Sequence, residues 1–240
     1  MTLTADPPYH ILGYPPLNGD MLGNPLFEPT LSLDEKTRMF ADWVSGYYKH
    51  PDSVDDLERR TPLTDPPPTI SIMTPEERAA ALYPSPGDPA TGGSDSVLNL
   101  AGIPSGVWPD IKEMVMRRPL SDGKVNGNGD AATRTGRSWA DVELCYLWCD
   151  ASVWEAIWGV HCMRREVQEA RAARRKLRKV TFVQIKDANH FVSDDLGVTR
   201  RYTDDLLMMQ IHWDRPEAAL QACLAKTSET EEVVIGCKMV

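Results

Sequence analysis

The chain lacks any apolar run near the roughly 20 residues that a membrane helix needs. Residues 1–8 hold no lysine, arginine or long apolar stretch, so they do not resemble a secretory signal peptide. Basic residues are few as well: 26 lysines and arginines against 35 aspartates and glutamates give a net charge of −9. Phosphate contacts require a basic surface, so the sequence predicts no nucleic-acid partner. It predicts no membrane partner either.

Cysteine is also scarce. The chain has five cysteines, an odd number, and no two of them form a Cys-x-x-Cys pair: Cys145, Cys149, Cys162, Cys223 and Cys237. This pattern argues against a disulfide framework or a zinc finger and favours a reducing compartment. We therefore expect a cytoplasmic protein, and the spacing of cysteine and histidine predicts neither a metal site nor a cofactor.

What is present is typical of a globular chain, with 240 residues, 42% hydrophobic and 25% charged. Proline, glycine and serine are spread unevenly and divide it into segments. The prolines of residues 1–30 predict an irregular lead-in. Residues 31–120 carry helical patterns, residues 121–138 form a polar linker, residues 139–225 alternate strand and helix patterns, and residues 226–240 form a tail.

The first half of the chain contains three helix signals. Ser32 and Glu35 form a capping box, and apolar residues recur at helical spacing after it, which predicts a helix over 33–48 with a buried aromatic face. Thr74 before Pro75 predicts a short helix, because proline is favoured in the first turn. A third helix is predicted over 108–118.

The second half reads as strand, helix, strand, helix. Residues 142–148 and 180–185 are short apolar or β-branched runs that are typical of buried strands. Residues 153–179 predict a long helix, and Asp214 before Pro216 predicts a last helix over 214–224. This order is typical of an α/β fold with parallel strands. The cations within 171–179 are interpreted as a solvated helix face rather than a nucleic-acid patch.

One motif points to chemistry. Residues 187–191 read Asp-Ala-Asn-His-Phe, and residues 211–217 read Ile-His-Trp-Asp-Arg-Pro-Glu. If residues 192–210 are removed, the joined text Ala-Asn-His-Phe-Ile-His-Trp-Asp-Arg-Pro-Glu resembles the catalytic-histidine loop of the α/β-hydrolase family, and within it the fungal toxin-biosynthesis type. The resemblance covers most of residues 1–225 and is strongest in 139–192 and 211–224.

The resemblance implies a partial α/β-hydrolase fold, with the last parallel strands flanked by helices and long irregular loops. Residues 1–30 would include the end of the sixth strand, residues 31–120 the helical cap domain, and residues 139–225 the C-terminal part of the core with an insertion at 192–210. The implied activity is hydrolysis of an ester, lactone or thioester of a small apolar metabolite, with that ester-type substrate as the expected partner.

The resemblance also assigns roles to residues. His190 matches the histidine that takes a proton from the nucleophile, and an acid on a neighbouring loop would orient it. Asp6, just past the sixth strand, and Asp150, just past the next one, are the two candidates. The strict position of the acid falls on Ser152, which cannot stabilise an imidazolium, so Asp6 is favoured. Read without the motif, Asp6 is a turn residue and Asp150 a helix cap.

A nucleophile is not identified. No Gly-x-Ser-x-Gly sequence occurs, and Ser138, in Gly-Arg-Ser-Trp-Ala, precedes a strand although an elbow requires a strand before it and a helix after it. The family's first five strands would lie upstream of Met1. We therefore expect an impaired hydrolase, or alternatively a non-catalytic pseudoenzyme or gene fragment that acts through protein association. The missing fifth strand would leave one sheet edge open to self-association.

The 19 residues of 192–210 interrupt the motif directly after Phe191. Valine and serine codons at 192–193 can supply an intron donor signal and Gln210 an acceptor signal, so one hypothesis is a short intron translated in frame. In either case, a charged insertion beside the histidine would loosen the geometry that catalysis needs.

Overall fold

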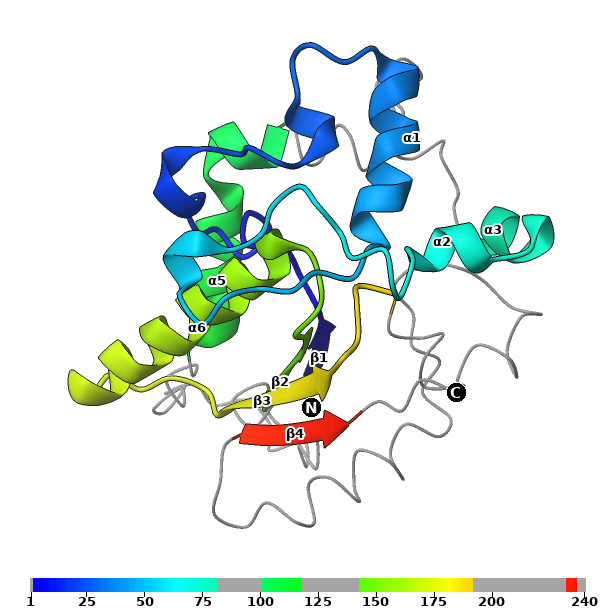
Figure 1. The fold of residues 1–240 in the computed structure, drawn as a ribbon. Helices are drawn as coiled ribbons and strands as arrows, with labels where there is room; N and C mark the ends of the chain where they lie inside the picture. Colours follow the sequence, from blue (N-terminus) through cyan, green and yellow to red (C-terminus); the bar gives the residue numbers. More distant parts are fainter. Residues whose placement is uncertain (1, 82–100, 118–142, 192–231, 237–240) are drawn as a thin grey trace, which may run out of the picture.

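The computed structural model describes residues 2–81, 101–117, 143–191 and 232–236. In this part of the chain a parallel sheet of four strands runs in sequence order, as Figure 1 shows: β1 (Thr2–Ala5), β2 (Leu144–Cys149), β3 (Val180–Lys186) and β4 (Glu232–Gly236). The mixed α/β class with parallel strands that the sequence predicts is confirmed.

The central strands β2 and β3 are buried along almost their whole length. Side chains alternate between the two faces of a strand, so Tyr146, Trp148 and Phe182 share one face, where they join the main hydrophobic core. The helix α6 (Trp154–Ala172) contributes Trp154, Trp158 and other apolar residues to the same core. Continuous apolar strands are the sequence signal of a sheet covered on both faces.

The helix α1 spans Leu33–Val44, and its capping box is present: Ser32 accepts a hydrogen bond from the backbone of Glu35, whose carboxylate accepts one from the backbone of Ser32. The prediction that this helix continues to residue 48 was wrong, because the chain leaves helical geometry at Ser45. Tyr48 is nevertheless buried, and its hydroxyl donates to the backbone oxygen of Trp43.

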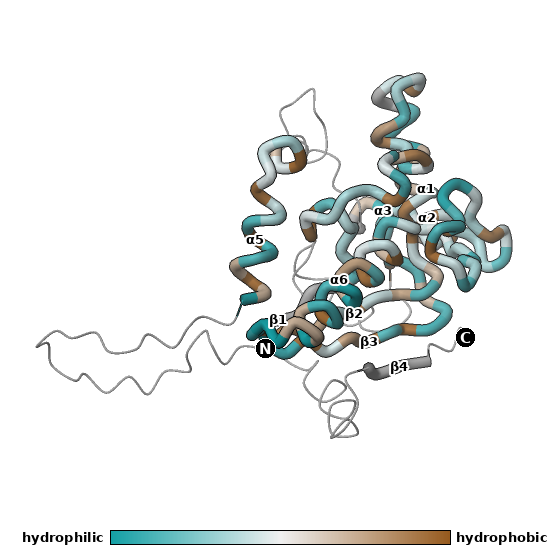
Figure 2. The backbone as a smooth tube through the Cα atoms, turned by 90° about the vertical axis from the view of Figure 1, so that its left-hand side faces the viewer, coloured by the Kyte–Doolittle hydropathy of each residue, from teal (hydrophilic) through white to brown (hydrophobic). Residues whose placement is uncertain are grey.

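Two of the remaining helices confirm their start signals. The helix α3 (Pro75–Ala81) begins after Thr74, whose hydroxyl accepts from the backbone N–H of Glu77. The helix α5 (Val107–Met116) begins one residue before the third predicted helix and ends two residues before the predicted end at 118, and Figure 2 shows it at the edge of the fold with hydrophobic residues along its length. A one-turn helix, α2 (Thr69–Ile72), was not predicted. In Figure 1, α1 to α3 lie beyond the carboxyl ends of the strands.

The long helix is shorter than the sequence predicts, ending at Ala172 instead of residue 179. Arg174 adopts a left-handed backbone conformation with φ of 53°, and the N–H of Arg175 donates to the oxygen of Ala170 at 2.8 Å. This contact closes the last helical turn and redirects the chain toward β3. Among the described residues, no helix is long and apolar enough to span a membrane.

The lead-in of residues 7–27 packs along α6. The backbone N–H of Tyr9 donates to the oxygen of Glu155, and the indole of Trp158 donates to the oxygen of Pro15. Gly13 has a positive φ of 70°, and a Cβ there would lie 2.6 Å from Cα of Pro109, so only glycine fits where the lead-in meets α5.

Three sequence-based predictions lie outside the described residues: the linker over 121–138, the insertion over 192–210 and the last helix over 214–224. The strand β4 lies in the tail of residues 226–240, for which the sequence analysis predicts no strand. The run Glu-Val-Val-Ile-Gly carries a β-branched signal that could have been recognised.

Candidate functional site

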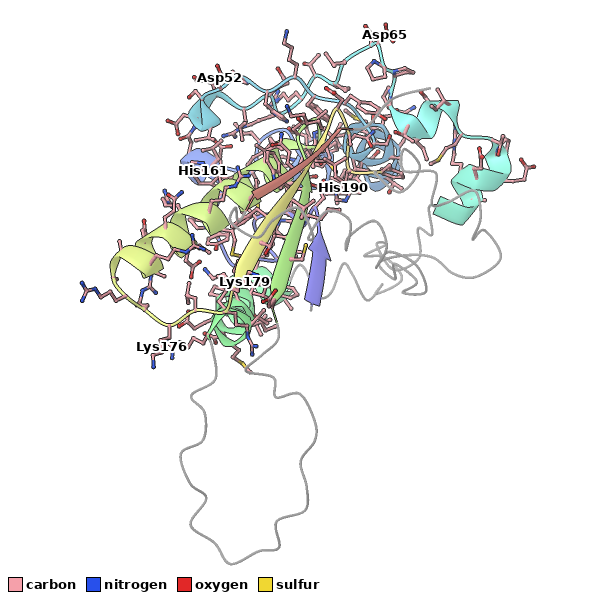
Figure 3. All side chains as sticks on the ribbon, turned by 90° about the horizontal axis from the view of Figure 1, so that it is seen from below. Asp52, Asp65, His161, Lys176, Lys179 and His190 are labelled. Carbon is pink, nitrogen blue, oxygen red and sulfur yellow. The ribbon has the colours of Figure 1, made fainter. Side chains whose placement is uncertain are left out.

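The candidate site lies where three neighbouring strands end. Asp6 follows β1, Ser152 follows β2, and His190 follows β3. Parallel strands present their carboxyl ends at one edge of a sheet, so side chains far apart in the sequence meet there. Figure 3 places His190 at this end, with Lys176 and Lys179 at the opposite end of the strands.

Asp6 contacts more residues of this site than Ser152 or His190 does, through both oxygens of its carboxylate. Its side chain is 2% exposed and its backbone has a positive φ of 43°, while its N–H donates to the oxygen of Leu147 at 2.8 Å and extends the pairing of β1 with β2. Oδ1 accepts from the backbone N–H of Cys149 at 3.2 Å, and Oδ2 accepts from the hydroxyl of Ser152. These two donors fix the position of the carboxylate.

The carboxylate of Asp6 also contacts the imidazole of His190, with 2.8 Å between Oδ2 and Nδ1. A carboxylate can only accept, so Nδ1 donates the proton and the lone pair of the neutral ring lies on Nε2. About a third of the His190 side chain is exposed. This is the orientation that a histidine base requires: one nitrogen is held by an acid, and the other has no partner among the residues that the structure describes.

Asn189 holds the loop that carries His190. It is fully buried, and its amide donates to the backbone oxygen of Ser45 at 2.6 Å and to the hydroxyl of Thr69 at 2.7 Å. Its Oδ1 accepts from the N–H of Phe191 at 2.8 Å. The asparagine of the Ala-Asn-His-Phe motif therefore ties the histidine loop to the segments that end α1 and begin α2.

The electrostatic surroundings of His190 act in opposite directions. Burial lowers the pKa of the imidazole, but the hydrogen bond and the charge of Asp6, together with the charge of Glu155, outweigh it, and the net pKa is raised. A raised pKa means that the imidazolium is stabilised in this site. A base that must hold a proton transiently needs this property.

Asp150, the other candidate acid, does not contact His190. Its Oδ1 accepts from the backbone N–H of Asp187 at 2.7 Å, and its Oδ2 accepts from the amide of Gln184 at 3.0 Å. It does not cap α6 either, since the N-cap residue is Val153 and makes no side-chain cap bond. Asp150 instead fastens the loop after β2 to the end of β3.

Sequence reasoning missed two residues that the structure brings to the site. Nε2 of His50 lies 2.7 Å from the backbone oxygen of Ser152, and burial lowers the pKa of His50, which keeps the ring neutral. A single histidine between Lys49 and Pro51 carries no recognisable signal.

Glu155 is the second missed residue. In the first turn of α6, its side chain is 3% exposed, and Oε1 accepts from the amide of Asn24 at 2.9 Å. Burial raises the pKa of Glu155 to about 7, although Asn24 and the positive charge of His190 act against that shift. A glutamate in a first helical turn is ordinarily interpreted as an exposed N-terminal acid, so its burial could not be predicted.

Within the described ranges, the structure gives Nε2 of His190 no hydrogen-bond partner, and no three His, Cys, Asp or Glu side chains are grouped to hold a metal ion. Ser138 lies outside the described residues. No known family model, curated protein or solved structure significantly matches the chain.

Proposed function

We propose that Asp6 and His190 form the acid–base half of a serine-type hydrolase site of the α/β-hydrolase kind. The supporting observation is the 2.8 Å contact between Nδ1 of His190 and the buried carboxylate of Asp6, at the carboxyl ends of adjacent parallel strands. The Ala-Asn-His-Phe motif and the strand order support the same family.

In this proposal Nε2 of His190 takes the proton of an attacking hydroxyl while the hydroxyl oxygen bonds to the carbonyl carbon of the substrate. The imidazolium that forms is stabilised by Asp6. His190 then returns the proton to the departing alcohol or thiol, and a water molecule repeats the two steps to release the acid. The proposal requires an attacking hydroxyl from outside the described residues.

The proposed substrates are esters, lactones or thioesters of small apolar metabolites. The resemblance to the fungal toxin-biosynthesis type of hydrolase supports this class. The hydrogen bonds of Asn189 to Ser45 and Thr69, which connect the His190 loop to the end of α1 and the start of α2, support a cap over an apolar substrate. Esters, lactones and thioesters each have an acyl carbonyl with an alcohol or thiol leaving group. One histidine can serve such a substrate twice, because it first takes a proton from the nucleophile and then gives it to the leaving group.

The test is covalent labelling of the full chain with a fluorophosphonate, together with hydrolysis of p-nitrophenyl butyrate. A working site predicts labelling and turnover that fall by at least about a hundredfold in His190→Gln and in Asp6→Asn. His161→Gln is the matched control, because His161 lies on α6, where it stacks on Trp158.

A second candidate function is a non-catalytic protein that acts through association. The observation that favours it is the absence, among the described residues, of any hydroxyl or thiol hydrogen-bonded to His190. In addition, β2 is the only neighbour of β1 in the sheet among the described residues, and an edge strand of this kind can pair with a strand from another chain. A wild-type chain that neither labels nor turns over, and that elutes as an oligomer, would support this function instead.

A further inference from the structure

A second surface of interest lies at the amino ends of the strands, away from His190. It combines exposed apolar side chains on α5 with exposed cations on the loop between α6 and β3. We call it the basic–apolar surface, and it consists of Ile111, Met114, Val115, Arg174, Arg175 and Lys176.

The apolar part is one face of α5. Met114 is 76% exposed, and Ile111 and Val115 are each 43% exposed. The neighbouring face of the same helix packs inward, since Met116 is 1% exposed and Lys112 pairs with Glu166 at 2.8 Å. A helix that buries one face and also exposes several aliphatic side chains on the other indicates an interaction site.

The cationic part follows α6 directly. Arg174, Arg175 and Lys176 are exposed and consecutive, and none of them makes an ion pair among the described residues. Figure 3 shows Lys176 at the outer turn of this loop. Three nearby acids are already paired: Glu113 with Arg117, Glu143 with Lys179, and Glu169 with Arg165.

The two parts are joined through the backbone. Arg117, at the end of α5, forms an isolated antiparallel bridge with Leu177, and the N–H of Arg178 donates to the oxygen of Met116 at 2.9 Å. Met114 and Val115 therefore lie within one helical turn of the residues that contact the cationic loop.

We propose that the basic–apolar surface binds the surface of an anionic phospholipid bilayer. Aliphatic side chains enter the boundary between headgroups and acyl chains, while arginine and lysine are attracted to the negative surface potential. This proposal departs from the prediction of no membrane partner, which rested on the absence of an apolar run long enough to span a bilayer; binding at the surface needs no such run. An acidic protein partner fits less well, because a few aliphatic side chains offer far less than the roughly 800 Å² per partner of a stable complex and no exposed aromatic anchor is among them.

The test is co-flotation of the full chain with two kinds of vesicle at low salt, one of phosphatidylcholine alone and one with about 30% phosphatidylserine. We expect binding to the anionic vesicles at least about tenfold tighter than to the neutral ones, and weaker binding as salt is added. The triple substitution of Arg174, Arg175 and Lys176 to Gln and the single substitution Met114→Gln should each weaken it, the triple by about tenfold or more.

The matched control removes the same charge from another part of the molecule. Arg38, Lys49 and Arg60 are exposed cations on α1 and the loops after it, and changing all three to Gln should leave vesicle binding within about twofold of the wild type. If both triple variants lost vesicle binding equally, the binding would depend on the net charge of the chain and not on this surface, and the proposal would be overturned. Equal binding to both vesicles, no binding to either, or binding to duplex DNA or polyglutamate without binding to vesicles would also overturn it. Circular dichroism of each variant shows whether it is folded.

Discussion

Nδ1 of His190 lies 2.8 Å from Oδ2 of Asp6, although 184 positions separate the two residues in the sequence. The contact arises because β1 and β3 flank β2 in a parallel sheet, so that the residues after β1 and β3 meet beyond the end of β2. The backbone N–H of Cys149, the last residue of β2, donates to the same carboxylate and holds it between the ends of β1 and β3.

The first prediction concerns the pKa of His190. In Asp6→Asn the imidazolium loses a charged hydrogen-bond acceptor while the burial that lowers the pKa of His190 remains. We therefore expect the pKa of His190 to fall below the ordinary histidine value, measured by NMR titration of the chain carrying ¹³C-labelled histidine. Asp150→Asn removes the acid that does not contact His190 and should leave that pKa unchanged. An equal fall in both variants would show that general charge, not the direct contact, raises it.

The second prediction concerns Asn189. Truncation in Asn189→Ala leaves the buried hydroxyl of Thr69 without its donor, and it leaves the backbone oxygen of Ser45 with the N–H of Thr69 in place of two donors. We expect the free energy of unfolding in urea to drop by about 2–3 kcal/mol, the cost of such unpaired buried groups. The exposed Gln168→Ala on α6 should change it by less than about 0.5 kcal/mol. Similar small losses in both variants would contradict the anchoring role.

Local signals in the sequence were enough to predict much of the fold. A capping box, a proline after threonine and two apolar runs each depend on interactions within a few residues, and the corresponding helix starts and strands are present. The predicted end of α6 was wrong because the chain turns at Arg174, which adopts a positive φ. Nothing in a run of arginines and lysines indicates that turn.

Part of the candidate site could likewise be predicted from the sequence and part could not. The histidine loop and the preference for Asp6 came from a family resemblance, and the structure brings those two side chains together while holding Asp150 apart. His50 and Glu155 could not be predicted as site residues. His50 contacts Ser152 and Glu155 lies near the charge of His190, and both relationships depend on how the loops pack after the strands have assembled. Such contacts leave no periodicity in the sequence.

The third prediction tests how the lead-in meets α5. Gly13 and Gly19 both have positive φ, 70° and 79°, but a Cβ on Gly13 would lie 2.4 Å from the nitrogen of Pro109, whereas one on Gly19 meets nothing within 4 Å. Gly19→Ala should therefore lose only the roughly 1 kcal/mol of left-handed strain, and Gly13→Ala at least about 2 kcal/mol more. Thermal or urea unfolding of both variants measures the difference. Equal losses would mean that the lead-in and α5 are not packed together.

The fourth prediction concerns stability and pH. Burial raises the pKa of Glu155 from 4.5 to about 7, so between these values the folded chain keeps a proton that the unfolded chain has lost. The stability that depends on neutral Glu155 is therefore complete below pH 4.5, declines as pH rises and is lost above about pH 7. Glu155→Gln cannot ionise, so its free energy of unfolding relative to the wild type should rise by about 3 kcal/mol between pH 4.5 and 8. Asn24 can still donate to the glutamine oxygen, which keeps the comparison matched. Urea denaturation at four or five pH values measures this difference, and parallel profiles for the two chains would show that folding does not raise the pKa of Glu155.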